Sequence, residues 1–199
     1  MHTTFNLIDQ HLFEIVIHDI GYSLDKIIND LKSEVWHCQN VGSNGLFDIE
    51  YCHPGSVNSQ KLQNIQNFLF SQEFKKQWIA QLVNNEIFKI QRPGIDSDWL
   101  QKNTMVNIDW GRTPPKQTKA PLHNDDINII SFGLIYLISH DDANQSTYFI
   151  KFNGTEEIRV PTGFGQGWIV VNTERSDHRA FNNTDNYRYH LRLSIKPKI

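Results

Sequence analysis

Hydrophobic positions follow two different periods along the chain. Residues 12–20 form a run rich in Ile, Val and Phe, which predicts a short strand. Apolar residues then recur every three or four positions, which predicts two amphipathic helices. The first begins after Ser23, a residue type favoured at the N-cap. The second extends over about residues 59–84, and Ser71 is a point at which it could divide in two.

Helical periodicity disappears after Pro93-Gly94, and short β-type runs alternate with turns. The predicted strands cover residues 104–110, 128–138, 147–152, 157–160, 167–172 and 187–195. Helices followed by a series of strands predict an α+β fold with two N-terminal helices packed on the major sheet. The length of 199 residues fits a single domain. We expect residues 1–95 to form its helical support and residues 104–195 its β core.

Composition excludes several classes of partner. A net charge of −3 without a Lys/Arg-rich run argues against nucleic acid, and no apolar stretch approaches the length of a membrane span. The N-terminus lacks the features of a signal peptide. We therefore expect a cytoplasmic protein in which Cys38 and Cys52 are reduced. A small-molecule or peptide partner fits this composition, whereas the oligomeric state is not predicted.

Candidate metal ligands open the strand-rich half. His123 and Asp125 are two residues apart, so on a strand their side chains point the same way. His178 follows the hydrophobic run of residues 167–171. Two imidazoles and one carboxylate form the facial triad of non-haem iron(II) sites, which leaves coordination positions open. The His-x-Asp pair alone is a weak signal, because His140 and Asp142 repeat the pattern.

Two arginines on the last predicted strand could bind an anionic co-substrate. Arg188 and Arg192 share one strand face, and Arg188 lies ten residues beyond His178. A guanidinium near the metal is suited to a bidentate grip on a carboxylate. Strand parity does not choose between the two arginines.

These motifs resemble the iron(II)/2-oxoglutarate-dependent dioxygenases, in particular the prolyl-hydroxylase branch and the aspartyl/asparaginyl and proline hydroxylases. The resemblance covers residues 104–195 and rests on His123-x-Asp125, Ile135-Tyr136-Leu137, Pro161-x-Gly-x-Gly, and His178 with Arg188. The usual Gly-Gly after the tyrosine strand is missing. The family pattern matches Arg188 better than Arg192, although Arg192-Leu193-Ser194 is similar to the signature of a related branch. It also favours His123 over His140, because the family tyrosine lies downstream of the first two ligands.

The resemblance implies a double-stranded β-helix, also called a jelly-roll or cupin-like fold. It implies that His123, Asp125 and His178 bind iron(II), while Arg188 and Tyr136 hold the distal carboxylate of 2-oxoglutarate. The expected activity is that of an oxidoreductase that uses O2 to hydroxylate an unactivated C–H bond, with release of succinate and CO2. An amino-acid or peptide-type substrate is favoured. Because the carboxylate Asp125 is present, halogenation is not expected.

Other readings of the strand-rich half make different predictions. A metal-dependent cupin isomerase would normally have a close His-x-His pair, which this chain lacks. A non-enzymatic β-sandwich binding module would bind neither metal nor 2-oxoglutarate. A nucleobase demethylase would need a basic groove for nucleic acid. Arg112 is a candidate for a substrate carboxylate, and Trp99, Trp110 and Trp168 are candidates for a substrate pocket or for core packing.

Overall fold

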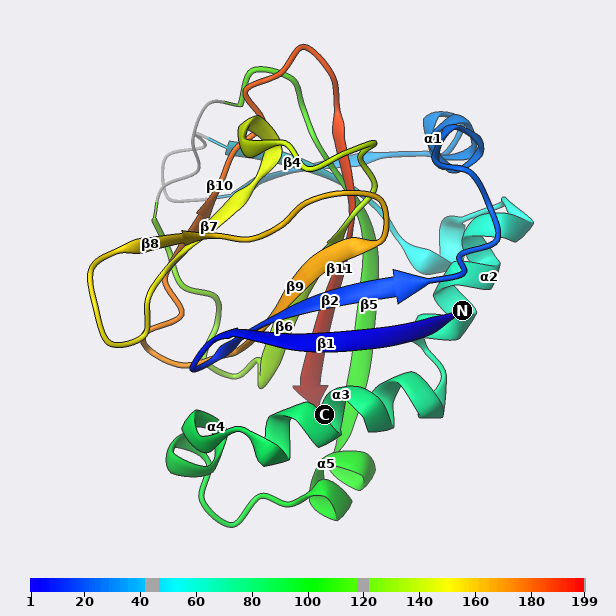
Figure 1. The fold of residues 1–199 in the computed structure, drawn as a ribbon. Helices are drawn as coiled ribbons and strands as arrows, with labels where there is room; N and C mark the ends of the chain where they lie inside the picture. The colour runs from blue at the N-terminus through cyan, green and yellow to red at the C-terminus, as the bar shows by residue number, and fades with distance from the viewer. Residues whose placement is uncertain (42–46, 118–121, 199) are drawn as a thin grey trace.

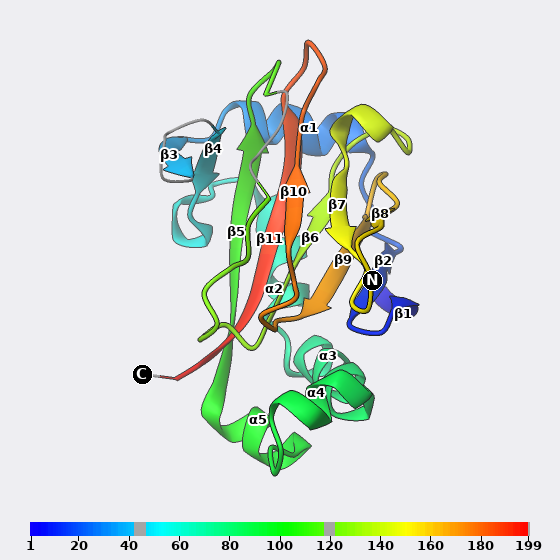
Figure 2. The same cartoon turned by 90° about the vertical axis from the view of Figure 1, so that its left-hand side faces the viewer.

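A computed structural model describes residues 1–41, 47–117 and 122–198, without the side chains of residues 38–41, 47 and 48. Two antiparallel sheets face each other (Figures 1 and 2). The larger sheet has the strand order β1-β2-β9-β6-β11-β5-β4-β3, and the smaller has the order β10-β7-β8. Within the described residues, no helix is long and apolar enough to cross a membrane.

The strands of the larger sheet are β1 (His2–Asp9), β2 (Leu12–His18), β3 (His37–Val41), β4 (Phe47–Cys52), β5 (Thr104–Thr113), β6 (Ser131–Tyr136), β9 (Gln166–Val171) and β11 (Arg188–Pro197). Those of the smaller sheet are β7 (Thr147–Ile150), β8 (Glu157–Arg159) and β10 (His178–Ala180). All six strands predicted after residue 104 are confirmed with shifted ends. The first half of the chain is more than a helical support, because β1 to β4 belong to the larger sheet.

The α-helices are α1 (Leu24–Lys32), α2 (Gln60–Leu69), α3 (Gln72–Asn84), α4 (Glu86–Gln91) and α5 (Ser97–Asn103). The division of the long predicted helix at Ser71 is confirmed: the Ser71 side chain accepts a hydrogen bond from the backbone N–H of Phe74 at 3.1 Å and caps α3. Ser23 precedes α1 without a side-chain cap bond. The short helices α4 and α5 were not predicted. Two 3₁₀ turns, Pro54–Ser56 and Ala143–Gln145, complete the regular structure.

The larger sheet has different neighbours on its two faces. Buried apolar residues of α1, α2 and α3 pack against one face in a single cluster, which includes Trp78, Trp110 and Leu193. On the other face a second cluster joins Phe132 and Trp168 to Phe149 of the smaller sheet. The space between the two sheets is therefore lined in part by these apolar side chains. Cys52 is a free, buried thiol, whereas the side chain of Cys38 lies outside the described residues.

Candidate active site

A cavity of about 160 Å³ opens between the two sheets. Its polar lining residues are Tyr51, His123, Asp125, His178, Arg188, His190 and Arg192. Its apolar lining includes Phe132, Leu134 and Trp168. The volume is below that of pockets for drug-sized ligands, so the cavity suits a small ligand held by several charged groups.

A backbone bridge brings the predicted metal ligands together. His123 and His178 form an isolated antiparallel bridge with N–H to C=O distances of 3.0 and 2.9 Å. Their imidazole rings lie 4.4 Å apart between centroids. The Nε2 atom of His178 lies 3.7 Å from Oδ2 of Asp125. His123 and His178, which are 55 positions apart in the sequence, thus lie side by side in space.

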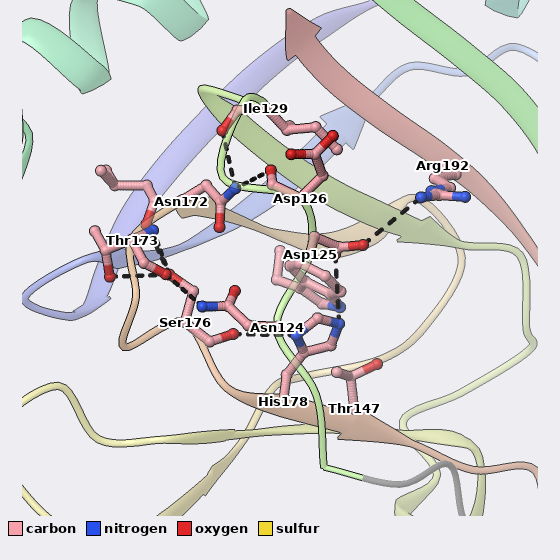
Figure 3. A network of polar contacts seen from close by, with 12 residues as sticks. Asn124, Asp125, Asp126, Ile129, Thr147, Asn172, Thr173, Ser176, His178 and Arg192 are labelled. Atoms are coloured by element: carbon pink, nitrogen blue, oxygen red, sulfur yellow. Dashed lines mark hydrogen bonds and ion pairs between the residues drawn. The ribbon is translucent and has the colours of Figure 1, made fainter. Parts of the chain in front are cut away.

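His178 has a defined orientation. Its Nδ1 lies 3.1 Å from the carbonyl oxygen of Ser176, which can only accept a hydrogen bond. Nδ1 therefore carries the proton, and Nε2 is left with its lone pair toward Asp125 (Figure 3). Burial, followed by the nearby His123, lowers the pKa of His178 to about 4. A neutral imidazole with a directed Nε2 is the form that binds a metal ion.

Amide side chains hold the segment that carries His123 and Asp125. Asn124 donates a hydrogen bond to the backbone carbonyl of Thr173 at 2.5 Å (Figure 3). Asn172 donates to the carbonyls of Asp126 and Ile129 at 2.8 and 2.9 Å. Both amides tie this segment to the turn after β9. Thr173 thus supports this segment through its backbone carbonyl.

Arg188 is a buried cation without an anionic partner. Its side chain is 1% exposed, and no carboxylate among the described side chains pairs with it. Nη1 lies 3.3 to 3.5 Å from the carbonyls of Gln145, Ser146 and Phe181, and Nη2 lies 3.1 Å from Oγ1 of Thr113. Among the described residues, its Nε has no hydrogen-bond partner. Burial lowers the pKa of Arg188, yet a guanidinium stays protonated in proteins, so this site is suited to a carboxylate.

Arg192 occupies a different position on the same strand face. Its side chain is 39% exposed. Nη1 donates to the hydroxyl of Tyr51 at 3.0 Å, and Nη2 lies 3.8 Å from Oδ1 of Asp125. Figure 3 shows Asp125 between Arg192 and His178. Arg188 therefore lies in the buried part of the cavity and Arg192 in its open part, a difference that strand parity could not provide.

Tyr136 lies beside Arg188 but is fully buried. The guanidinium carbon of Arg188 is 5.8 Å from the centre of the Tyr136 ring. The hydroxyl of Tyr136 donates to Oγ1 of Thr147 at 2.7 Å and accepts from Nε1 of Trp168 at 3.2 Å. Tyr136 is not one of the residues that line the cavity. Its contact with a co-substrate carboxylate stays a prediction, since the Tyr136 hydroxyl would have to give up its hydrogen bond with Thr147 or with Trp168.

The second His-x-Asp pair lies outside the cavity. His140 is exposed and contacts Ser139, while Asp142 caps the 3₁₀ turn at Asn144. Arg112 is also outside: it pairs with Glu50 and lies over the ring of Trp36, 4.5 Å from its centre. The expectation that Arg112 receives a substrate carboxylate is not supported by this placement.

The three candidate tryptophans have different surroundings. Trp168 lines the cavity. Trp110 belongs to the core on the helix-covered face and contacts the side chain of Gln66. Trp99 is 40% exposed on α5. Core packing or surface exposure thus accounts for two of the three, and only Trp168 is placed to contact a ligand.

No protein-family model and no curated protein sequence matches the chain, whereas its structure matches solved structures over most of its length. An oxidoreductase of the 2OG-Fe(II) oxygenase family from Burkholderia pseudomallei is 13% identical, with a TM-score of 0.55, covering 87% of this chain and 78% of that chain. A prolyl hydroxylase from Trichoplax adhaerens, in complex with a hypoxia inducible factor peptide, is 13% identical, with a TM-score of 0.57, covering 92% and 83%. The non-heme alpha ketoglutarate dependent epimerase of nogalamycin biosynthesis is 11% identical, with a TM-score of 0.58, covering 94% and 78%. This chain has the 2OG-Fe(II) oxygenase fold.

The fold prediction, an α+β double-stranded β-helix, is confirmed by these matches. The substrate is left open at such identities, because the neighbours of this oxygenase fold include both a prolyl hydroxylase and an epimerase. The epimerase is also known in complex with Fe3+ and alpha ketoglutarate.

The donor set fits iron and 2-oxoglutarate in its chemistry. The 3.7 Å between Nε2 of His178 and Oδ2 of Asp125 can be spanned by one ion with bonds of about 2.1 Å to each. The orphaned Nε of Arg188 fits a carboxylate in the buried part of the cavity. Nevertheless, no group of three or more His, Cys, Asp or Glu side chains in the described residues is already arranged to hold a metal ion. The triad therefore remains a prediction.

Two polar residues of the cavity were missed in the sequence. Tyr51 comes from β4, where apolar Phe47, Ile49 and Tyr51 alternate with Asp48 and Glu50; this alternation is a strand signal that could have revealed it. His190 lies between Arg188 and Arg192 on β11, and the parity that groups these arginines would have included it. A Cβ atom at Gly111 would collide with the His190 ring, so this glycine provides the space for it.

Proposed function

We propose that this protein is an iron(II)- and 2-oxoglutarate-dependent dioxygenase that hydroxylates an unactivated C–H bond of an amino-acid or peptide-type substrate. The observation that carries the proposal is the buried, carboxylate-free guanidinium of Arg188 in the cavity that His123, Asp125 and His178 also line. A buried cation is costly without an anion. In the 2OG-Fe(II) oxygenase fold, the distal carboxylate of 2-oxoglutarate would supply it.

The residues of this chain divide the work of the site. His123, Asp125 and His178 would hold the iron, with the proton of His178 kept on Nδ1 by Ser176. Arg188 would anchor the distal carboxylate and so orient the keto-acid end toward the metal. When bound, iron(II) and 2-oxoglutarate supply the oxidising chemistry, in which O2 and 2-oxoglutarate yield hydroxylated product, succinate and CO2.

Apolar side chains shield this reaction from water. The His178 ring stacks on Phe149 with 5.1 Å between centroids and contacts Phe132 and Trp168. These walls lower the local dielectric around the ligands, which strengthens their interactions with a metal ion. They also leave the open part of the cavity, beside Arg192, as the side from which a substrate would approach.

Succinate formation tests the proposal directly. Purified protein would be supplied with iron(II), ascorbate, O2 and 2-oxoglutarate, with and without candidate amino acids and peptides. We expect iron-dependent succinate formation that His178→Ala abolishes. His140→Ala is the matched control, because His140 belongs to the His-x-Asp pair outside the cavity, and it should keep full turnover. Equal turnover by His178→Ala, or loss in His140→Ala alone, would contradict the assignment.

A further inference from the structure

Among the described residues, no carboxylate lies closer than 3.8 Å to the guanidinium of Arg192. Two other strand arginines have tight partners: Arg159 donates to both carboxylate oxygens of Asp141, and Arg179 pairs with Glu157. The nearest carboxylate of Arg192 is that of Asp125, at 3.8 Å. If Asp125 binds the metal, its charge is committed there. Arg192 is then a cation at the open part of the cavity, available for a ligand.

Tyr51 completes a binding position for a carboxylate. Its hydroxyl accepts a hydrogen bond from Nη1 of Arg192 at 3.0 Å, and within the described part of the chain its own O–H has no acceptor, so it can donate to a ligand. Both side chains line the cavity. Burial raises the pKa of the Tyr51 hydroxyl, so it stays a protonated donor. A carboxylate can therefore accept from the guanidinium and from the phenol together.

A negative charge lies directly across the sheet from Arg192. Asp109 on β5 is the register partner of Arg192 on β11. Paired residues of antiparallel strands place their side chains on the same face, about 5 Å apart at Cβ. Asp109 is 35% exposed, and its carboxylate lies 3.5 Å from Nδ1 of the exposed His53. Arg192 thus lines the open part of the cavity, and Asp109 lies on the neighbouring strand, outside the cavity lining, as an anion beside it.

We propose that this pair recognises a free α-amino acid, with its carboxylate on Arg192 and Tyr51 and its ammonium group on Asp109. The inference rests on the proposed function, in which Asp125 and Arg188 are occupied by the metal and the co-substrate. An α-amino acid carries its two opposite charges on groups bonded to the same carbon, a spacing that matches cross-strand neighbours. A residue inside a peptide has neither charge, so it would leave both side chains desolvated without partners.

Anaerobic calorimetry tests this substrate class. Each common L-amino acid would be titrated into protein loaded with iron(II) and 2-oxoglutarate, followed by the N-acetyl and carboxamide derivatives of the best ligand. We expect binding by one amino acid or a chemically related group. Acetylation and amidation should each weaken it at least tenfold, because each removes one charge.

Two conservative variants separate recognition from structure. Arg192→Gln should abolish the preference for the acid over its carboxamide, and Asp109→Asn should abolish the preference for the free over the acetylated amine. Each variant should leave the other preference intact, a pattern that misfolding would not produce. Arg175→Gln, at an exposed arginine, should keep both preferences.

The outcomes distinguish the inference from the proposed function. If 2-oxoglutarate binds but no amino acid does, or if the neutral derivatives bind as well as the free amino acid, the inference is overturned and the dioxygenase proposal stands. If 2-oxoglutarate itself does not bind to iron-loaded, folded protein, the proposed function fails and this substrate assignment fails with it.

Discussion

The two faces of strand β11 are made of residues with opposite character. Toward the helices it presents Tyr189, Leu191, Leu193 and Ile195, all buried in the larger apolar cluster. Toward the smaller sheet it presents Arg188, His190, Arg192 and Ser194. One stretch of backbone therefore contributes an ordinary core on one side and a charged cavity on the other.

The two faces of β11 therefore contribute to different properties: the apolar face to folding stability and the charged face to ligand binding. Burial of the apolar face lowers the free energy of the folded chain, whereas burial of Arg188 and His190 costs free energy unless a partner compensates. The charged face is thus explained by what it binds. Changes on the apolar face should affect unfolding, and changes on the charged face should affect ligands.

The largest expected effect is on the apolar face. Leu191→Ala should destabilise the protein by about 2–5 kcal/mol, because it removes a fully buried side chain and leaves a cavity. Urea unfolding measures this change. The affinity of the remaining folded protein for 2-oxoglutarate should stay within about twofold of wild type. A large loss of affinity would show that the two faces are not independent.

Arg188→Met alters the charged face of β11 instead of the apolar face. We expect the affinity for 2-oxoglutarate to fall at least about a hundredfold, because the buried partner of its distal carboxylate is lost. Anaerobic calorimetry on iron-loaded protein measures this, with Arg175→Met as the exposed control. An affinity within a few-fold of wild type would transfer the anchoring role from Arg188 to Arg192.

A second buried histidine tests whether burial alone explains a low pKa. His11 is fully buried against Phe152, and its Nδ1 lies 3.5 Å from the carboxylate of Asp9. Burial lowers its pKa from 6.5 to about 4. Between these values the unfolded chain binds the proton more readily, so stability should decrease as the pH falls from 6.5 to 4, by on the order of 3 kcal/mol.

The pH effect is measured by urea unfolding at pH 7 and pH 5. His11→Phe should reduce this dependence, whereas His140→Phe, at an exposed position, should keep it; the buried His178, whose pKa is also lowered to about 4, should contribute part of what is left. An unchanged pH dependence in His11→Phe would locate the titrating group elsewhere, and His178 would then be the next histidine to test.

The smallest effect should come from the support of the metal ligands. Asn124→Ala removes the hydrogen bond that ties the His123–Asp125 segment to the carbonyl of Thr173. We expect the affinity for iron(II) to fall by roughly tenfold with little change in unfolding. Competition with a chromogenic chelator measures this, and Asn128→Ala, at an exposed neighbour, is the control. No change would mean that the backbone bridge and the amide of Asn172 hold the segment without Asn124.

Strong local patterns made much of the fold predictable. The alternation of apolar and polar residues in β11 indicates one buried face of a strand. The helical spacing of Leu62, Ile65 and Leu69 likewise indicates one buried face of a helix. Strand β1 was missed because it lies at a sheet edge and none of its residues is fully buried. Strand β10 was missed because three residues are too few to show a period.

The candidate site was only partly predictable for a similar reason. His123, Asp125, His178 and Arg188 could be singled out because their spacing matches a known pattern. The separation of Arg188 from Arg192 depends on where the smaller sheet covers β11, and the role of Tyr51 depends on the pairing of β4 with β5. Such long-range contacts leave no periodic signal in the sequence.

The most direct test of the central claim is the weak visible charge-transfer band of a keto acid chelated to iron(II), recorded without oxygen. We predict that 2-oxoglutarate produces this band in the wild type. His178→Ala should not show it, and Arg188→Met should show it only at much higher 2-oxoglutarate concentrations. Absence of the band in folded wild-type protein that carries iron(II), or an undiminished band in His178→Ala, would contradict the account.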